Sequence, residues 1–311
     1  MNGNDHSISR RTFIGSLAAA LAAVSFAPPG LRAAERDLIR KTIPGTGETL
    51  PVIGLGTSRT LDVSGDPAAL SGLAEVLQAF FDHGGELIDS SPMYGSAEQV
   101  LGELLNRVGR REKLFAATKV WTDGEQAGIR QMEDSRQKWG ITRFDLMQIH
   151  NLRDWRIHLK TLQSWKAEGK IRYTGITTSH GRFHRELEEI LRSEPLDFVQ
   201  LSYNIEDRTV EKRLLPLAAD RGMAVLVNRP YQRGDLFRRV KGKELPGWAA
   251  EFDGTSWGQF FLKFIVSHPA VTCVIPATSK VHHLRDNMAA GFGRLPDTAM
   301  RKRMADYFAS L

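Results

Sequence analysis

The sequence is nearly free of cysteine and has no extended run of one charge. Cys273 is the only cysteine in 311 residues, so no intrachain disulfide is possible, and its apolar surroundings at 271–275 predict a small core residue. The 42 basic and 36 acidic residues give a net charge of +6, without a basic cluster beyond the N-terminus. We therefore expect no nucleic-acid surface, although a pocket for a phosphorylated ligand would fit. With 41% hydrophobic and 25% charged residues, the chain is neither disordered nor fibrous but an ordinary soluble globular protein.

The N-terminus has the pattern of a twin-arginine export signal. Arg10 and Arg11 precede a short uncharged segment, 15–26, and the small residues Ala33 and Ala34 follow. This segment is too short for a membrane span, so we expect no stable span in the mature protein. We predict that residues 1–34 form the signal, that the twin-arginine machinery exports the chain, and that 35–311 form a single periplasmic domain. The alternative is an uncleaved amphipathic anchor.

Strand-like and helix-like segments alternate along the rest of the chain. Apolar strand-like runs occur at 51–57, 86–89, 114–120, 145–150, 173–177, 198–201, 224–227 and 272–275. Segments with helical periodicity occur at 68–81, 97–107, 124–139, 154–167, 184–192, 209–219, 256–267 and 280–290. Together they predict an α/β fold, a closed (β/α)8 TIM barrel. The rival is an open doubly wound sheet, which is disfavoured because Gly54 and Gly56 lack the third glycine of a dinucleotide fingerprint.

Additional segments flank the predicted barrel. Short extended pieces around a Pro-Gly-Thr-Gly turn predict an N-terminal β-hairpin over residues 40–50. The segments 233–252 and beyond Gly291 predict extra helical pieces packed on the barrel towards the C-terminus. Ser96 is placed to cap the helix that begins at Ala97.

Four polar side chains are expected at the ends of three consecutive strands. Asp89 ends the run 86–89, Tyr94 lies in the loop after it, Lys119 lies near the end of 114–120, and His150 ends 145–150. Because the strands of a closed barrel converge with their carboxyl ends on one face, we expect these four side chains to form one site.

The four residues suit acid–base chemistry at a carbonyl group. A buried ammonium stabilises a phenolate, an imidazole donates to or orients its oxygen, and Asp89 supplies the counter-charge that Lys119 needs. Tyr94 is then the proton donor to a carbonyl oxygen as hydride reaches its carbon, and the phenolate is the base in the reverse direction. Taken singly, the residues also suit plainer roles: a solvent-reaching lysine, a satisfied histidine, a capping aspartate and a packing tyrosine. Their joint occurrence at three consecutive strand ends favours the functional interpretation.

Three motifs give the sequence a resemblance to the aldo-keto reductase family. They are Ile88-Asp-Ser-Ser-Pro-Met-Tyr-Gly95, Ala117-Thr-Lys119 and Gln148-Ile-His150, and the likeness extends from about residue 43 to residue 291. The resemblance implies that the same four residues are the family's catalytic tetrad on a (β/α)8 barrel. It further implies reduction of an aldehyde or ketone by NADPH or NADH, without a metal.

The resemblance also implies a set of cofactor-binding residues. They are Gly56, Thr57, Asp89, Thr177, Thr178, Gln200, Asn228, Pro230, Tyr231, Gly234, Thr278, Ser279, Lys280, His283 and Asn287. Gln200 and the pair Thr177-Thr178 match positions that bind the nicotinamide carboxamide, where the family usually has Ser-Asn. Asn228 stands where many members stack an aromatic ring on the nicotinamide, so another ring such as Tyr231 or Tyr203 is the candidate.

The last predicted strand and helix resemble the family's adenosine-phosphate site. The hydroxyls of Thr278 and Ser279 and the following helix N-terminus suit phosphate oxygens. His283 replaces the family's usual arginine, while Lys280 and Arg285 are available to supply positive charge. We expect NADP(H) to be preferred and NAD(H) to be possible.

Two residues are expected to line the substrate pocket. Trp121 and Asn151 follow the strands of Lys119 and His150, so we expect them to line the pocket and to favour an apolar or flat carbonyl substrate.

Two alternative functions are also open. One alternative is a nucleotide-sensing regulatory barrel with little turnover. Another is an exported redox-repair or sugar-modifying protein with a bound, poorly exchanging cofactor.

Overall fold

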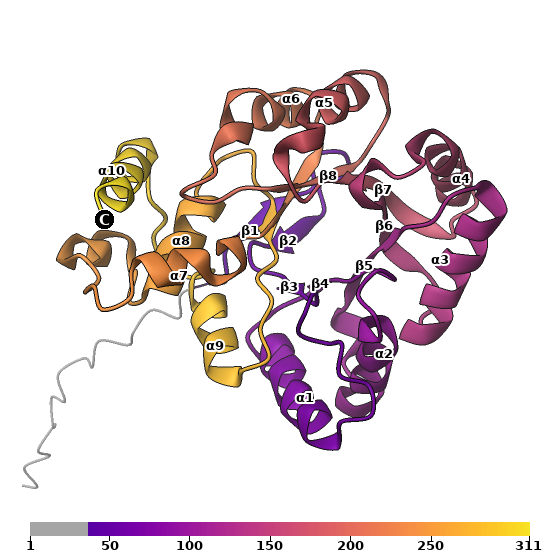
Figure 1. Ribbon diagram of the computed structural model, residues 1–311, viewed down its shortest axis with the longest axis horizontal. Helices are drawn as coiled ribbons and strands as arrows, with labels where there is room; N and C mark the ends of the chain where they lie inside the picture. The colour runs from indigo at the N-terminus through magenta and orange to yellow at the C-terminus, as the bar shows by residue number, and fades with distance from the viewer. Residues whose placement is uncertain (1–36) are drawn as a thin grey trace, which may run out of the picture. The chain divides into compact units, whose positions relative to one another are not determined.

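The strands form one parallel sheet that closes into a barrel (Figure 1). The computed structural model describes residues 37–311, and the predicted export signal, 1–34, lies outside them. In order around the barrel, the strands are β3 (Leu55–Gly56), β4 (Leu87–Asp89), β5 (Phe115–Val120), β6 (Phe144–Ile149), β7 (Ile171–Thr177), β8 (Phe198–Ser202), β9 (Ala224–Asn228) and β10 (Cys273–Val274). Parallel bridges from Ile53 to Val274 and from Gly56 to Ala277 join the two ends of the sheet. The predicted (β/α)8 barrel is confirmed.

A small antiparallel hairpin precedes the barrel, as predicted. β1 (Arg40–Thr42) pairs with β2 (Thr49–Pro51). The first barrel strand is shorter than the predicted 51–57: Pro51 belongs to the hairpin, and Ile53 joins the sheet only through an isolated bridge to Val274. Ile43 and Leu50 pack in the same cluster as the side chains inside the barrel. The hairpin therefore closes the end of the barrel at which the strands begin.

Side chains inside the barrel alternate along each strand. Leu87, Phe115, Leu146, Tyr173 and Phe198 belong to one buried cluster, in which the rings of Tyr173 and Phe198 lie 5.4 Å apart. Because strand side chains alternate between two faces, this inward series continues in steps of two. It leads from Leu87 to Asp89, from Phe115 to Lys119, from Leu146 to Gln148 and His150, and from Phe198 to Gln200.

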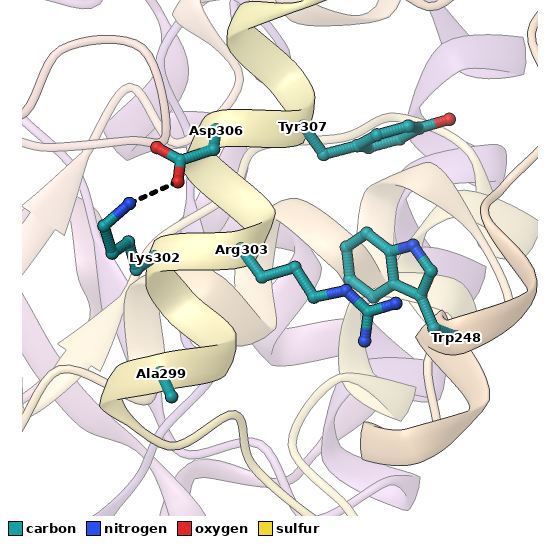
Figure 2. A pocket seen from close by; sticks show the side chains of 6 residues that line it. All are labelled: Trp248, Ala299, Lys302, Arg303, Asp306 and Tyr307. Atoms are coloured by element: carbon teal, nitrogen blue, oxygen red, sulfur yellow. Dashed lines mark hydrogen bonds and ion pairs between the residues drawn. The ribbon is translucent and has the colours of Figure 1, made fainter.

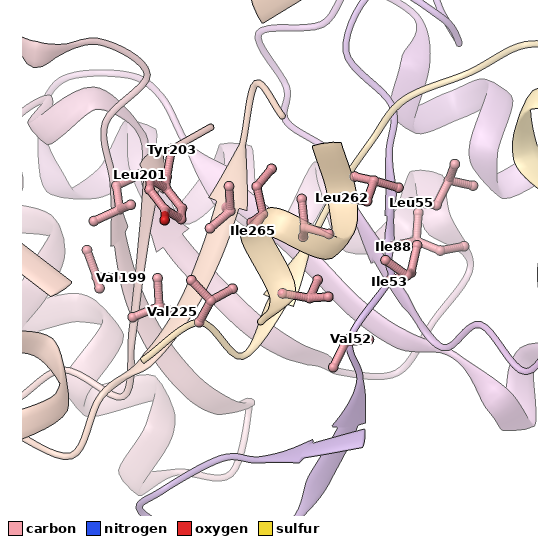
Figure 3. Packing of buried hydrophobic residues seen from close by; sticks show 14 of the residues in the cluster. Val52, Ile53, Leu55, Ile88, Val199, Leu201, Tyr203, Val225, Leu262 and Ile265 are labelled. Carbon is pink, nitrogen blue, oxygen red and sulfur yellow. The ribbon is translucent and has the colours of Figure 1, made fainter. Parts of the chain in front are cut away.

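Helices cover the outer face of the barrel (Figure 1). They are α1 (Pro67–Asp82), α2 (Ala97–Val108), α3 (Glu125–Trp139), α4 (Trp155–Ala167), α5 (His184–Ser193), α6 (Leu214–Asp220), α8 (Trp257–Val266) and α9 (Val281–Ala289). Figure 3 shows how Leu262 and Ile265 of α8 lie among apolar side chains of the strands, such as Val225. The outward side chains of each strand thus meet the apolar stripe of a helix, which removes both from water.

The helix predicted over 209–219 is divided in two. A 3-10 turn, Thr209–Lys212, is followed by α6, and Arg213 between them has a φ of −139°. Proline has no N–H, and its ring clashes with the carbonyl four residues earlier, so Pro216 fits only in the first turn of a helix. The helix therefore begins at Leu214, and the proline was the signal that the sequence prediction overlooked.

The predicted extra segments are helical. α7 (Asp235–Arg239) and a 3-10 turn (Gly247–Phe252) lie between β9 and α8, and α10 (Thr298–Ala309) ends the chain. Arg301 of α10 donates to the Tyr203 hydroxyl at 2.5 Å and to Glu211 at 2.8 Å, which anchors α10 to the barrel. Within 37–311, no helix is both long enough and apolar enough to cross a bilayer.

Candidate active site

Lys119 and Asp89 form a buried ion pair at the carboxyl ends of adjacent strands. Lys119 Nζ lies 2.5 Å from Asp89 Oδ1 and 2.7 Å from the Ser90 carbonyl oxygen, and the relative exposures of the two residues are 0% and 2%. Burial alone would lower the pKa of Lys119, but Asp89 and then Tyr94 outweigh it, so the pKa lies above its ordinary value. Lys119 is therefore a fixed positive charge in a dry environment.

Two glutamines complete the surroundings of Asp89. The side-chain amides of Gln148 and Gln200 each donate to Asp89 Oδ2 at 2.9 Å. Gln200 also donates to Gln148 Oε1 at 3.1 Å and accepts from Asn228 Nδ2 at 3.3 Å. Both carboxylate oxygens are thus hydrogen-bonded, which stabilises the buried negative charge. The Gln200 amide, expected at the nicotinamide carboxamide, already has partners within the barrel.

His150 is buried beside the ion pair. Its Nδ1 lies 2.8 Å from the Ser91 hydroxyl, and its ring stands edge-on to Tyr94 with 5.8 Å between the ring centres. Burial, helped by the Lys119 charge, lowers the pKa of His150 to about 2. The imidazole is therefore neutral at physiological pH and carries one N–H.

Tyr94 lies above Lys119 on the loop after β4. Lys119 Nζ is 5.3 Å from the centre of its ring. Burial raises the pKa of the Tyr94 hydroxyl above its ordinary value, and the Lys119 charge opposes that rise. The hydroxyl is therefore protonated before reaction, and the neighbouring cation favours the phenolate that would remain after proton transfer.

Asp62 holds the loop that carries Tyr94. Its carboxylate accepts from the Ser96 N–H at 2.9 Å and from the Ser96 hydroxyl at 2.8 Å. As predicted, α2 begins at Ala97 with Ser96 at its N-cap position, but the Ser96 side chain makes no capping hydrogen bond to the helix. Gly95 has a φ of +60°, and a Cβ there would lie 2.4 Å from Asp62 Oδ1. Glycine is therefore required for Asp62 to approach the loop.

A cavity of about 550 Å³ opens over these residues. Asp89, Tyr94 and His150 line it, together with residues from the carboxyl ends of the other strands: Gly56, Thr57, Ser58, Arg59, Thr60, Met93, Thr177, Ser179, Gln200, Asn228, Arg229, Pro230, Tyr231, Arg233, Gly234, Phe237, Ile275 and Ala277. Lys119 lies beneath this lining. No group of three or more potential metal ligands occurs in 37–311.

Comparison with known proteins identifies the family. The model of the aldo/keto reductase family matches residues 52–303. The chain belongs to the aldo/keto reductase family. It is 28% identical over 258 residues to methylglyoxal reductase YeaE of Escherichia coli (strain K12), covering 80% of this chain and 89% of that protein. It is 30% identical over 249 residues to the NADH-specific methylglyoxal reductase of the same organism, covering 67% of this chain and 73% of that protein.

Solved structures of aldo/keto reductases share the fold. The aldo/keto reductase from Klebsiella pneumoniae in complex with NADP and acetate is 23% identical, with a TM-score of 0.72, and the match covers 86% of this chain and 94% of that chain. This likeness confirms the barrel. The family match and the reductase relatives together make the protein an oxidoreductase.

The cavity of this aldo/keto reductase contains most of the expected nicotinamide-side residues. The exception is Thr178, which is fully buried next to the lining residue Thr177, and whose hydroxyl lacks a hydrogen-bond partner in the described chain. Its carbonyl accepts from Asn228 Nδ2 at 2.9 Å, and Asn228 Oδ1 accepts from Ser202 at 2.7 Å.

The expected adenosine-phosphate residues lie outside the cavity lining. Thr278 accepts the Lys280 N–H at 3.1 Å, whereas Ser279, Lys280 and His283 are exposed at the start of α9. Asn287 is buried and accepts from the hydroxyl of Tyr231, a lining residue, at 2.6 Å. This hydrogen bond joins α9 to the cavity wall.

The expected substrate residues also lie beside the lining rather than in it. The Trp121 ring centre is 6.4 Å from that of His150, and Arg153 packs 5.0 Å from the Trp121 ring. Asn151 accepts from Ser179, which is a lining residue, at 3.1 Å.

Sequence reasoning missed three arginines that line the cavity: Arg59, Arg229 and Arg233. Each has a positive φ, of 66°, 50° and 57° respectively, which is a strained conformation for a residue with a Cβ. Within 37–311, no ion pair or side-chain hydrogen bond engages their guanidinium groups. Burial, followed by the nearby Arg233 charge, lowers the pKa of Arg229. A cavity with three unpaired cations is suited to an anionic ligand.

A second cavity lies against α10 (Figure 2). Trp248, Ala299, Lys302, Arg303, Asp306 and Tyr307 line it. Its charged groups are already paired, Lys302 with Asp306 at 2.5 Å and Arg303 with Glu251 at 3.1 Å. It contains no group with an acid–base arrangement like that around Lys119, so the barrel cavity is the candidate active site.

Proposed function

We propose that this aldo/keto reductase reduces a small aldehyde or ketone to an alcohol with a nicotinamide cofactor. The observation that carries the proposal is the buried Lys119, held 2.5 Å from Asp89 beneath the cavity that Tyr94 and His150 line. A fixed cation next to a phenol is the arrangement that a tyrosine needs in order to lose a proton during reaction.

Each residue of the site has a role in the proposed reaction. The bound cofactor supplies hydride to the carbonyl carbon. Tyr94 donates its proton to the carbonyl oxygen, and Lys119 stabilises the phenolate that forms. Neutral His150 donates its N–H to the same oxygen, and Asp89 keeps Lys119 in place. In the reverse direction, the Tyr94 phenolate removes the proton of an alcohol.

The cavity residues fit a nicotinamide nucleotide. The unpaired hydroxyl of Thr178, beside Thr177, suits the carboxamide, provided that a small adjustment opens it to the cavity. Arg59, Arg229 and Arg233 suit the phosphates, because guanidinium groups bind phosphate oxygens in pairs. We propose NADP(H) as the preferred cofactor. The relatives support nicotinamide nucleotides in general, since one is NADH-specific and one structure contains NADP.

Tyr94→Phe tests the proposed reaction. This change should lower kcat for the NADPH-dependent reduction of methylglyoxal, the substrate named for two relatives, by about 10²–10⁴-fold, because it removes the proton donor. Cofactor binding should remain. Tyr307→Phe, on α10 far from Asp89, is the matched control. Near-normal turnover in Tyr94→Phe would refute the role. Tight nucleotide retention with no turnover on a panel of carbonyls would favour the sensing alternative.

We also propose that residues 1–34 direct export by the twin-arginine machinery. The support is the pair Arg10-Arg11 followed by a short uncharged segment. In cell fractionation, the protein should appear in the periplasm, and the double change Arg10→Lys and Arg11→Lys should retain it in the cytoplasm. Equal distribution of both forms would contradict the proposal.

A further inference from the structure

Ser91 contacts the imidazole of His150 inside the site. Ser91 is fully buried, and its Oγ lies 2.8 Å from His150 Nδ1. The same oxygen accepts the Met93 N–H at 3.2 Å. The Ser91 hydroxyl hydrogen therefore has one acceptor in the described chain, His150 Nδ1.

This geometry selects one of the two neutral forms of the imidazole. A serine hydroxyl has one hydrogen and two lone pairs, so accepting the Met93 N–H does not by itself prevent Ser91 Oγ from accepting a proton on Nδ1 as well. In that form, however, the buried Ser91 hydrogen would have no acceptor in 37–311, so the geometry favours an unprotonated Nδ1. The single ring proton then resides on Nε2. His150 lines the cavity, and its Nε2 makes no hydrogen bond to any residue of 37–311. The free N–H is therefore left for a ligand.

The other neutral form would be unsuited to a carbonyl substrate. With the proton on Nδ1, the Nε2 lone pair would face the lone pairs of the substrate oxygen and repel them. Only the Nε2–H form presents a donor where negative charge develops.

We propose that Ser91 is a positioning residue that holds His150 in the Nε2–H form and so presents a hydrogen-bond donor to the substrate oxygen. The inference rests on the proposed carbonyl reduction. Two different features act on His150: burial, helped by the Lys119 charge, keeps the ring neutral, and the Ser91 hydroxyl determines which nitrogen carries the proton.

The form of His150 is measured directly by NMR, without substrate. In protein labelled with ¹⁵N-histidine, two-bond ¹H–¹⁵N correlations distinguish the two neutral forms, and the signals missing from His150→Asn assign the residue. We expect Nε2–H in the wild-type protein and a mixture in Ser91→Ala. Ser90→Ala removes a buried hydroxyl that bonds Thr57 at 2.8 Å instead of His150, so it should leave the wild-type form unchanged. An Nδ1–H form in the wild-type protein, or no change in Ser91→Ala, would overturn the proposal.

Turnover supplies the second measurement. Ser91→Ala should lower kcat by about tenfold, with little change in the KM for cofactor, because one oriented hydrogen bond to the substrate is weakened. Ser91→Thr keeps a hydroxyl and should restore both the His150 form and part of kcat. A Thr variant with the wild-type form but the kcat of the Ala variant would contradict the positioning role. Absence of reductase activity in the wild-type protein would refute the proposed function, while the NMR result would still decide the form of His150.

Discussion

The two sides of the active-site cavity differ in how their polar groups are satisfied. The paired side consists of Asp89, Lys119, His150 and their partners Ser91, Gln148 and Gln200. Asp89 receives three donors, and His150 is bonded through Nδ1. This side is complete in the folded chain and needs no ligand to hold its geometry.

The unpaired side consists of Arg59, Arg229, Arg233 and Thr178. Within the described part of the chain, the three guanidinium groups and the Thr178 hydroxyl have no hydrogen-bond partner, and the arginines have positive φ angles. Strain and unpaired polar groups are tolerated where a ligand compensates for them. Under the proposed function, the acid–base side is preorganised by folding, whereas the unpaired side would be completed by a bound nucleotide.

The largest effect on stability is expected from breaking the buried ion pair of the paired side. Asp89→Ala should lower the free energy of unfolding by about 3–5 kcal/mol, because it leaves the Lys119 charge buried and unpaired. The double variant with Lys119→Met should lose less than Asp89→Ala alone. Asp306→Ala breaks an exposed pair of the same 2.5 Å length with Lys302 and should cost less than about 1 kcal/mol. Urea unfolding measures all four proteins; a double variant that loses as much as Asp89→Ala, or more, would contradict the prediction.

The second-largest expected effect is a loss of unfolding free energy at acidic pH, which arises from the paired side. The pKa of His150 is about 2 in the folded protein and near 6.5 when unfolded, so between these pH values only the unfolded chain binds the proton. The contribution of His150 to the free energy of unfolding is complete above pH 6.5. It falls as the pH decreases, by roughly 2 kcal/mol at pH 5. His268, with a pKa of about 4, acts in the same direction. His150→Gln should flatten the decline of unfolding free energy between pH 8 and pH 5; an unchanged slope would contradict the assignment.

Substitutions on the unpaired side should weaken cofactor binding while leaving the stability of the fold nearly unchanged. Arg229→Gly should weaken NADP(H) binding by about 10–100-fold, because a charge-assisted hydrogen bond to phosphate is lost. The free energy of unfolding should change by less than about 1 kcal/mol, since the side chain has no partner in 37–311 and glycine tolerates a φ of 50°. Arg238→Ala, on α7 outside the cavity, is the control. Fluorescence titration with NADPH gives the affinities, and equal values for both variants would remove Arg229 from the nucleotide site.

A pair of threonines gives the smallest and most direct test of the contrast. Thr178→Val removes a buried hydroxyl without a partner and should raise the free energy of unfolding by about 1 kcal/mol. Thr57→Val removes a buried hydroxyl bonded to Ser90 Oγ at 2.8 Å and should lower it by about the same amount. Thermal or urea unfolding without cofactor is the measurement. Effects of equal sign would mean that the lack of a partner for the Thr178 hydroxyl does not decide its effect on stability.

The sequence allowed the barrel and the location of the paired side to be predicted. The strand and helix periodicities were clear, and inward-facing residues at strand ends must converge in a closed barrel. Asp89, Lys119 and His150 meet for that reason. Their roles in catalysis stay predictions until the variants are measured.

The partners and the unpaired side could not be predicted in the same way. Arg229 and Arg233 reach the cavity from a left-handed backbone conformation. This conformation favours glycine, so an arginine in the sequence gives no reason to predict it. Ser96 follows the usual pattern of a helix cap, yet Asp62, thirty-four positions earlier, engages its N–H and hydroxyl. Such choices depend on contacts between loops that are distant in sequence. By contrast, the interruption of the predicted helix at Arg213 could have been predicted from Pro216.

Cys273 gives the protein a built-in chemical reporter. It lies on β10 and is fully buried, its Sγ would be 3.2 Å from a Cβ at Gly54, and burial raises the pKa of its thiol. Because the thiolate is the reactive form, a thiol reagent cannot modify it while β10 remains joined to the segment before β3. With no other cysteine in the chain, the rate of labelling measures how often the seam of the barrel opens, in the native sequence and without an added probe.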